Sequence, residues 1–168
     1  MEHEDEEVYG WIRRFQAQIM DYPKSILDIG CRSGYGTRRL KEIWPKADIQ
    51  GIDINHLCLN KAPKYCLQMD ACQLNYDGDA FEWIFSCATL EHVWNVDQAA
   101  QEWMRVASKG IYVVTNLEKE PSASHYSWTL NPFDWLNSFD YPGWRLNHCA
   151  TLENDKVFEF SFKRDPYA

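Results

Sequence analysis

The sequence contains no apolar run that approaches the ~20 residues needed to cross a bilayer, so we expect no membrane association. Its first residues, Met-Glu-His-Glu-Asp-Glu-Glu, carry the wrong charge for a secretory signal or a transit peptide, which predicts a cytoplasmic protein. Positive charge is scarce, because 17 Lys and Arg stand against 25 Asp and Glu and leave a net charge of −8. Binding nucleic acid by its phosphates requires clustered basic residues, so no nucleic-acid partner is expected.

Cysteine occurs six times, but no two cysteines form a Cys-x-x-Cys pair, and His56 is the only histidine near the group from Cys58 to Cys72. This spacing fits no common zinc site, so no metal is expected. Without an export signal, the cysteines are predicted to be reduced thiols, most of them buried.

The chain also lacks repeats and an interdomain linker, and its 168 residues suit a single domain over 1–168. Apolar side chains recur at helical spacing within residues 5–20, which predicts an N-terminal helix in the segment 1–22 before a core over 23–168.

From residue 25 onward, short apolar runs alternate with helical patterns. Strands are predicted at 25–29, 49–53, 65–69, 83–87, 111–115, 144–152 and 157–163, the last with Phe158, Phe160 and Phe162 on one face. Helices are predicted at 36–44, 57–62, 97–107 and 132–139, the third with Asp97 as N-cap. The predicted fold is α/β: a doubly wound, mostly parallel seven-stranded sheet with an antiparallel C-terminal hairpin and helices on both faces.

The most informative segment, Ile26-Leu27-Asp28-Ile29-Gly30-Cys31-Arg32-Ser33-Gly34-Tyr35-Gly36-Thr37, joins the first predicted strand to the next helix. Glycines let a backbone turn tightly and admit a ligand close to the main chain, and such ligands bind at the carboxyl ends of strands. The dinucleotide fingerprint needs glycines at 30, 32 and 35, where the chain has Gly30, Arg32 and Tyr35, and the Gly-Lys-Ser/Thr ending of a P-loop is absent. A dehydrogenase is therefore disfavoured.

The segment instead resembles motif I of the class I S-adenosylmethionine-dependent methyltransferases, Asp-x-Gly-x-Gly-x-Gly, with Arg32 in place of the middle glycine. Three further blocks follow in the family's order. Gly51-Ile52-Asp53-Ile54 ends the second predicted strand, and Met69-Asp70-Ala71 ends the third. Residues 81–93 resemble the fourth-strand block F-D-x-I-x-S-x-x-x-L-E-H-V, with Glu82 where Asp is commoner, and this version is similar to the small-molecule, type 11-like branch.

The resemblance implies a Rossmann-like enzyme (EC 2.1.1.-) that uses S-adenosyl-L-methionine and releases S-adenosyl-L-homocysteine. In the family, the acid after the second strand binds the ribose hydroxyls and the acid after the third accepts from the adenine amino group, which assigns these roles to Asp53 and Asp70. The cofactor-binding residues expected on this basis are Asp28, Gly30, Cys31, Arg32, Gly34, Asp53, Ile54, Asp70, Ala71, Ser86 and Cys87.

Several of these residues also have a purely structural interpretation. Asp28 could cap the loop, Asp53 could satisfy a turn, and Asp70 could cap a helix or a turn. Glu91 and His92, in the loop after the fourth predicted strand, could likewise be structural hydrogen-bonding groups. Arg32 could point to solvent, pair with the methionine carboxylate, or fill space that the family's glycine leaves open.

The implied reaction is an in-line displacement at the sulfonium methyl, in which the protein mainly aligns the nucleophile and excludes water. His92 and His125 are the candidate bases. The Asn/Asp-Pro-Pro-Tyr and Pro-Cys motifs of nucleic-acid enzymes are missing, so a small-molecule acceptor is expected, with a protein side chain second. Arg32 and the short chain leave open an inactive, methyltransferase-like scaffold that acts through a partner.

Overall fold

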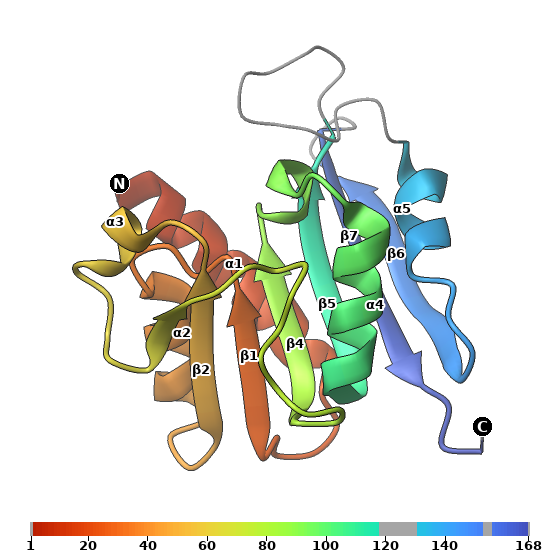
Figure 1. Ribbon diagram of the computed structural model, residues 1–168, viewed down its shortest axis with the longest axis horizontal. Helices are drawn as coiled ribbons and strands as arrows, with labels where there is room; N and C mark the ends of the chain where they lie inside the picture. Colours follow the sequence, from red (N-terminus) through yellow and green to blue (C-terminus); the bar gives the residue numbers. More distant parts are fainter. Residues whose placement is uncertain (1, 118–130, 153–155, 168) are drawn as a thin grey trace.

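The computed structural model describes residues 2–117, 131–152 and 156–167, and it confirms the predicted α/β fold (Figure 1). A single seven-stranded sheet has the order β3-β2-β1-β4-β5-β7-β6. Strands β1 to β5 pair in parallel, and β7 joins β5 antiparallel with β6 beyond it. The elements are α1 (Glu2–Gln18), β1 (Ser25–Ile29), α2 (Tyr35–Ile43), β2 (Asp48–Asp53), α3 (His56–Leu59), β3 (Cys66–Gln68), β4 (Phe81–Cys87), η1 (Leu90–His92), α4 (Val96–Val106), β5 (Ala107–Asn116), α5 (Pro132–Ser138), β6 (Trp144–Leu152) and β7 (Val157–Arg164).

Two apolar cores lie on opposite faces of this sheet. α1 and α2 cover one face, where Phe15 packs between Trp44, Trp83 and Tyr112. α4 and α5 cover the other face, as Figure 1 shows for α4 in front of β5. The central strands are buried on both faces, which explains why β1 and β4 are apolar runs without alternation.

The structure corrects the N-cap of the helix predicted at 97–107. The helix begins at Val96, and the side chain of Asn95 accepts the capping hydrogen bond from the backbone N–H of Gln98. Asp97 instead accepts a hydrogen bond from the Ser138 hydroxyl at 2.7 Å and so links α4 to α5. The helix also ends one residue early, because Ala107 already pairs with Phe81 as the first residue of β5.

The last strand, β7, is buried on both faces, although its alternating sequence marks only one of them as apolar. Phe158, Phe160 and Phe162 share one face, as predicted, and they are buried in the core on the α5 side. Glu159 and Ser161 on the opposite face are buried too, at 1% and 0% exposure, because α1 covers them. A polar residue on a strand is therefore no guide to exposure where a distant helix supplies its hydrogen bonds.

A buried polar cluster fastens α1 to the antiparallel end of the sheet. The Glu159 carboxylate accepts from the Arg14 guanidinium, with Nε at 2.9 Å, and from the Tyr112 hydroxyl at 2.6 Å. Burial alone would raise the pKa of Glu159, but the hydrogen bonds from Arg14 and Tyr112 outweigh it and hold that pKa below its usual value. Glu159 is therefore an ionised, satisfied group rather than an isolated buried acid.

The cysteines are less buried than predicted. Cys31 and Cys66 are buried, Cys58, Cys72 and Cys87 are half-buried, Cys149 is exposed, and all six are free thiols. The described residues contain no cluster of His, Cys, Asp or Glu that could hold a metal ion. None of the described helices combines the length and the apolar character that a membrane span requires.

Glu159→Ala is expected to lower the free energy of unfolding by about 2–4 kcal/mol, because it leaves the buried Tyr112 hydroxyl and the Arg14 guanidinium without their acceptor. Urea unfolding at pH 7 measures the change. Glu42→Ala is the matched control, since its ion pair with Arg39 lies at the surface, where such pairs contribute about 0–1 kcal/mol. Equal losses in the two variants would contradict the anchoring role of Glu159.

Candidate functional site

A cavity of about 990 Å³ opens at the carboxyl ends of the parallel strands. Its wall takes residues from the ends of β1, β2 and β4, from the segments that follow β2, β3 and β4, and from α1, which contributes Glu7 and Val8. The size lies at the upper end of the range for small-molecule sites, about 300–1,000 Å³. The position is the one at which open α/β sheets bind ligands.

Gly30 holds the first loop against both neighbouring strands. Its N–H donates to the Ile52 carbonyl at 2.8 Å, and the N–H of Cys31 donates to the same oxygen at 2.9 Å. Gly30 has φ +81°, and a Cβ there would lie 1.9 Å from Oγ1 of Thr89, which follows β4. Only glycine fits both the left-handed backbone and this close approach.

Arg32, which stands at the place of the motif's middle glycine, has a left-handed backbone with φ 49°. Its N–H donates to Oδ2 of Asp53 at 2.9 Å, and the N–H of Asn55 donates to Oδ1 at 2.8 Å. The two backbone groups fix the plane of the Asp53 carboxylate at the end of β2. Because a carboxylate offers about four lone-pair sites, each oxygen can still accept from a ligand in the cavity.

Asp70 occupies the corresponding place after β3. It is exposed on the cavity wall, and its Oδ1 accepts from the backbone N–H of Cys72 at 2.8 Å. The N–H of Gln73 donates to the Asp70 carbonyl at 3.0 Å, which closes a tight turn. The side chains of Asp53 and Asp70 therefore face one cavity from adjacent strand ends.

The cavity brings together most of the residues that sequence reasoning assigned to cofactor binding. Those that line it are Gly30, Arg32, Asp53, Ile54, Asp70, Ala71 and Cys87. The candidate base His92 is exposed and lies on the same wall, whereas His125 falls outside the described residues.

Four of the assigned residues do not line the cavity and support the loop from behind. Asp28 is 3% exposed and accepts from the Thr37 hydroxyl at 2.6 Å. Ser86 is fully buried and donates to the Ile29 carbonyl at 3.1 Å. Gly34 and Cys31 are also buried, and a Cβ on Gly34 would lie 2.6 Å from Pro63. The structural interpretation of Asp28 as a support of the loop fits this placement.

The loop after β4 is held by a second buried carboxylate. Glu91, at 2% exposure, accepts from the Thr115 hydroxyl at 3.0 Å and from the Asn116 amide at 2.6 Å. These bonds tie η1, which contains His92, to the end of β5. Glu91 is thus a structural hydrogen-bonding group, in agreement with the structural interpretation of its place in the sequence.

Comparison with known proteins agrees with this geometry. A family model described as a methyltransferase domain matches residues 27–115, which is more than half of the 168 residues and includes the strand ends that form the cavity. The chain belongs to this family.

A curated relative of this methyltransferase-domain protein is the malonyl-[acyl-carrier protein] O-methyltransferase of Halorhodospira halophila (strain DSM 244 / SL1). It is 28% identical over 95 residues, and the match covers 52% of this chain but only 32% of that relative. The chain therefore spans about a third of the length of that enzyme.

Solved structures share the fold of this methyltransferase-domain protein at low identity. A SAM-dependent methyltransferase from Aquifex aeolicus has a TM-score of 0.74 at 14% identity, covering 92% of this chain and 89% of the other. A Haloferax volcanii putative methyltransferase, solved in complex with the Trm112 methyltransferase activator, has a TM-score of 0.76 at 13% identity, covering 98% and 93%. At these identities the likeness establishes the Rossmann-like methyltransferase fold.

Several wall residues of this methyltransferase-domain protein escaped the sequence reasoning. Thr89 lies two residues after β4, and Asn116 is the last residue of β5, so the rule that ligands bind at carboxyl strand ends could have indicated them. Glu7, Gln98 and the 83%-exposed Trp94 come from helix α1, helix α4 and the loop between η1 and α4. No local signal distinguishes these three from ordinary surface residues.

Burial gives Asp28 an unusual protonation behaviour. Loss of hydration raises the pKa of this carboxyl to about 7, with a smaller increase from the charge of Asp53 and an opposing effect of the Thr37 hydrogen bond. A carboxyl whose pKa is higher in the folded than in the unfolded protein binds its proton more tightly in the folded state. The resulting stabilisation is fully present at a pH below the unfolded pKa, and it is lost as the pH rises through the folded pKa.

Asp28→Asn removes this pH-dependent loss, so the variant is expected to gain stability over the parent protein as the pH rises. The difference in the free energy of unfolding, variant minus parent, should be on the order of 3–4 kcal/mol larger at pH 8 than at pH 4. The amide oxygen still accepts from Thr37, so the variant mainly removes the titration. Urea unfolding at both pH values measures the difference, with exposed Asp48→Asn as control. A difference that does not depend on pH would contradict the raised pKa.

Proposed function

We propose that this protein is a S-adenosyl-L-methionine-dependent methyltransferase (EC 2.1.1.-) that methylates a small-molecule acceptor. The observation that carries the proposal is the pair of carboxylates, Asp53 and Asp70, at adjacent strand ends of one cavity that the glycine loop also lines. Membership of the methyltransferase-domain family supports the same conclusion.

The wall residues fit this cofactor by their chemistry. Asp53, held by two backbone N–H groups, presents acceptors for the ribose hydroxyls, and Asp70 presents an acceptor for the adenine amino group. Ile54, which is 65% exposed on the wall, offers an apolar surface for the base. Arg32 on the same wall is the group to pair with the methionine carboxylate.

The charge of the wall also suits a positively charged donor. The carboxylates of Glu7, Asp53 and Asp70 outnumber the guanidinium of Arg32 among the described lining residues. When bound, S-adenosylmethionine supplies a methyl group that its sulfonium already activates. The protein then has to hold the donor and acceptor in line and exclude water, which is worth on the order of 7–11 kcal/mol of the barrier.

The acceptor end of the cavity is assigned to the segment from Ala88 to Trp94 and to Asn116, which lie at the ends of β4 and β5. His92 is the described residue proposed to contact the acceptor and, where the nucleophile has to lose a proton, to accept it. A small-molecule acceptor accords with the family branch, and a protein side chain is the second possibility. The curated relative acts on a malonyl group borne by a carrier protein, as its name states.

A second candidate function is that of a methyltransferase-like subunit that acts through a partner protein. The structural neighbour in complex with the Trm112 activator favours this candidate, because that neighbour matches 98% of this chain. The two functions differ in whether the purified chain binds the cofactor by itself.

Calorimetric titration of the purified chain with S-adenosylmethionine and, separately, with S-adenosylhomocysteine tests the proposal. Binding in the micromolar range, about −8 kcal/mol, is expected for both ligands. A folded chain that binds neither would overturn the proposal in favour of the partner-dependent subunit.

Asp53→Ala is expected to weaken binding of S-adenosylhomocysteine by roughly 1.5–3 kcal/mol, the range for hydrogen bonds to a charged group. The same titration measures the change. Asp48→Ala is the matched control, because Asp48 is exposed at the opposite end of the same strand. Unchanged affinity in a folded Asp53→Ala variant would refute the ribose assignment.

A further inference from the structure

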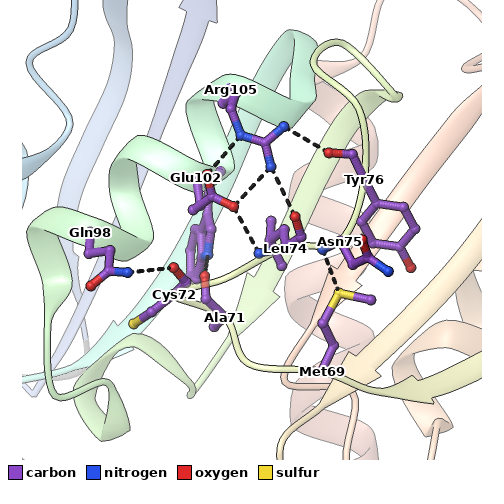
Figure 2. Close-up of polar contacts among 10 residues, drawn as sticks. Met69, Ala71, Cys72, Leu74, Asn75, Tyr76, Gln98, Glu102 and Arg105 are labelled. Atoms are coloured by element: carbon purple, nitrogen blue, oxygen red, sulfur yellow. Dashed lines mark hydrogen bonds and ion pairs between the residues drawn. The ribbon is translucent and has the colours of Figure 1, made fainter.

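The segment that follows β3 contains no regular secondary structure between Asp70 and Asp79, yet side chains of α4 hold most of its first half (Figure 2). The indole N–H of Trp103 donates to the Ala71 carbonyl at 3.0 Å. The amide of Gln98 donates to the Cys72 carbonyl at 3.0 Å. These two bonds fix the residues that come directly after Asp70.

Glu102 and Arg105 hold the next part of the segment as a pair. The backbone N–H of Leu74 donates to Oε2 of Glu102 at 2.8 Å, and Arg105 donates to the carbonyls of Leu74 at 3.0 Å and Tyr76 at 2.7 Å. Arg105 Nε donates to Glu102 Oε1 at 2.7 Å, as Figure 2 shows. Hydrogen bonding from Arg105 lowers the pKa of Glu102 and keeps the carboxylate ionised.

The pair lies behind the cavity wall, whereas the backbone that it holds continues into that wall. Asp70, Ala71, Cys72 and Gln73 line the cavity, but Glu102 and Arg105 do not. The hydrogen bonds of Arg105 therefore reach the cavity wall through the segment from Asp70 to Tyr76.

We propose that Arg105 and Glu102 are positioning residues that set the preference of this site for adenine over other purines. The proposal rests on the proposed function, in which Asp70 accepts from the exocyclic amino group of adenine. A segment without regular structure otherwise loses conformational entropy when a ligand orders it, and the pair removes that cost before the ligand arrives. With the segment loosened, Asp70 can shift to suit a base of different hydrogen-bonding pattern.

The test compares two ligands that differ only at the base. S-adenosylhomocysteine carries an amino group at position 6 of the purine, whereas S-inosylhomocysteine carries a carbonyl oxygen there, which meets the Asp70 carboxylate as acceptor against acceptor. The parent protein is expected to prefer the adenine ligand by about 10- to 150-fold, the factor that one hydrogen bond to a charged group supplies.

Arg105→Lys is the test variant, because a lysine cannot reproduce the forked contacts to two carbonyls and a carboxylate. It is expected to lower the adenine preference by about threefold or more, while the melting temperature stays close to that of the parent. Arg39→Lys is the matched control, since Arg39 forms an ion pair of the same i,i+3 spacing with Glu42 on α2 and does not contact the segment. The control is expected to leave the preference unchanged.

Hydrogen–deuterium exchange on the ligand-free proteins provides a readout that needs no cofactor. Arg105→Lys is expected to raise exchange at the amides of residues 71–76 relative to both the parent and Arg39→Lys. An unchanged adenine preference in folded Arg105→Lys, or unchanged exchange over 71–76, would overturn the positioning role. A parent protein that binds neither S-adenosylhomocysteine nor S-inosylhomocysteine would instead refute the proposed function, whatever the exchange result.

Discussion

Parallel pairing of β1 with its neighbours β2 and β4, and of β2 with β3, is the constraint on which the candidate site depends. Parallel strands need crossover connections, so the segments that leave their carboxyl ends all meet at one edge of the sheet. Hydrogen bonds then join these segments to one another. The Ile52 carbonyl at the end of β2 accepts from Gly30 and Cys31, and the Thr89 hydroxyl after β4 donates to the Ile29 carbonyl at 3.3 Å.

Polar groups around the cavity fall into two sets with different surroundings. Asp28 and Glu91 are buried and accept hydrogen bonds from other side chains, so they maintain the backbone geometry of the loops that follow β1 and β4. The carboxylates of Asp53 and Asp70 accept hydrogen bonds from backbone N–H groups, and both residues line the cavity. This division lets a small chain keep the two cavity carboxylates in fixed orientations, because the buried carboxylates that support the loops are themselves hydrogen-bonded.

Helix α1 links the cavity to the far, antiparallel end of the sheet. Its first half contributes Glu7 and Val8 to the cavity wall, and its second half binds β7 through Arg14 and Glu159. The hairpin of β6 and β7 therefore does more than complete the sheet, since it supplies the anchor for a helix that closes one side of the site. α4 has a comparable role on the opposite face through the segment after β3.

Much of the fold could be predicted because the relevant forces act locally along the chain. The strand over 25–29 agrees with β1 residue for residue, since burial on both faces leaves an apolar run between polar boundaries. The resemblance to the family's motif blocks assigned Asp53, Ile54, Asp70 and Ala71 to one site, and their places at or just after the ends of β2 and β3 agree, because the carboxyl ends of parallel strands meet at one edge of the sheet. Tertiary structure alone decided that Asp28 and Ser86 face the interior while Glu7 and Gln98 reach the cavity. Orientation of a side chain at a strand end depends on which distant helix packs there, and that packing leaves no mark on the neighbouring sequence.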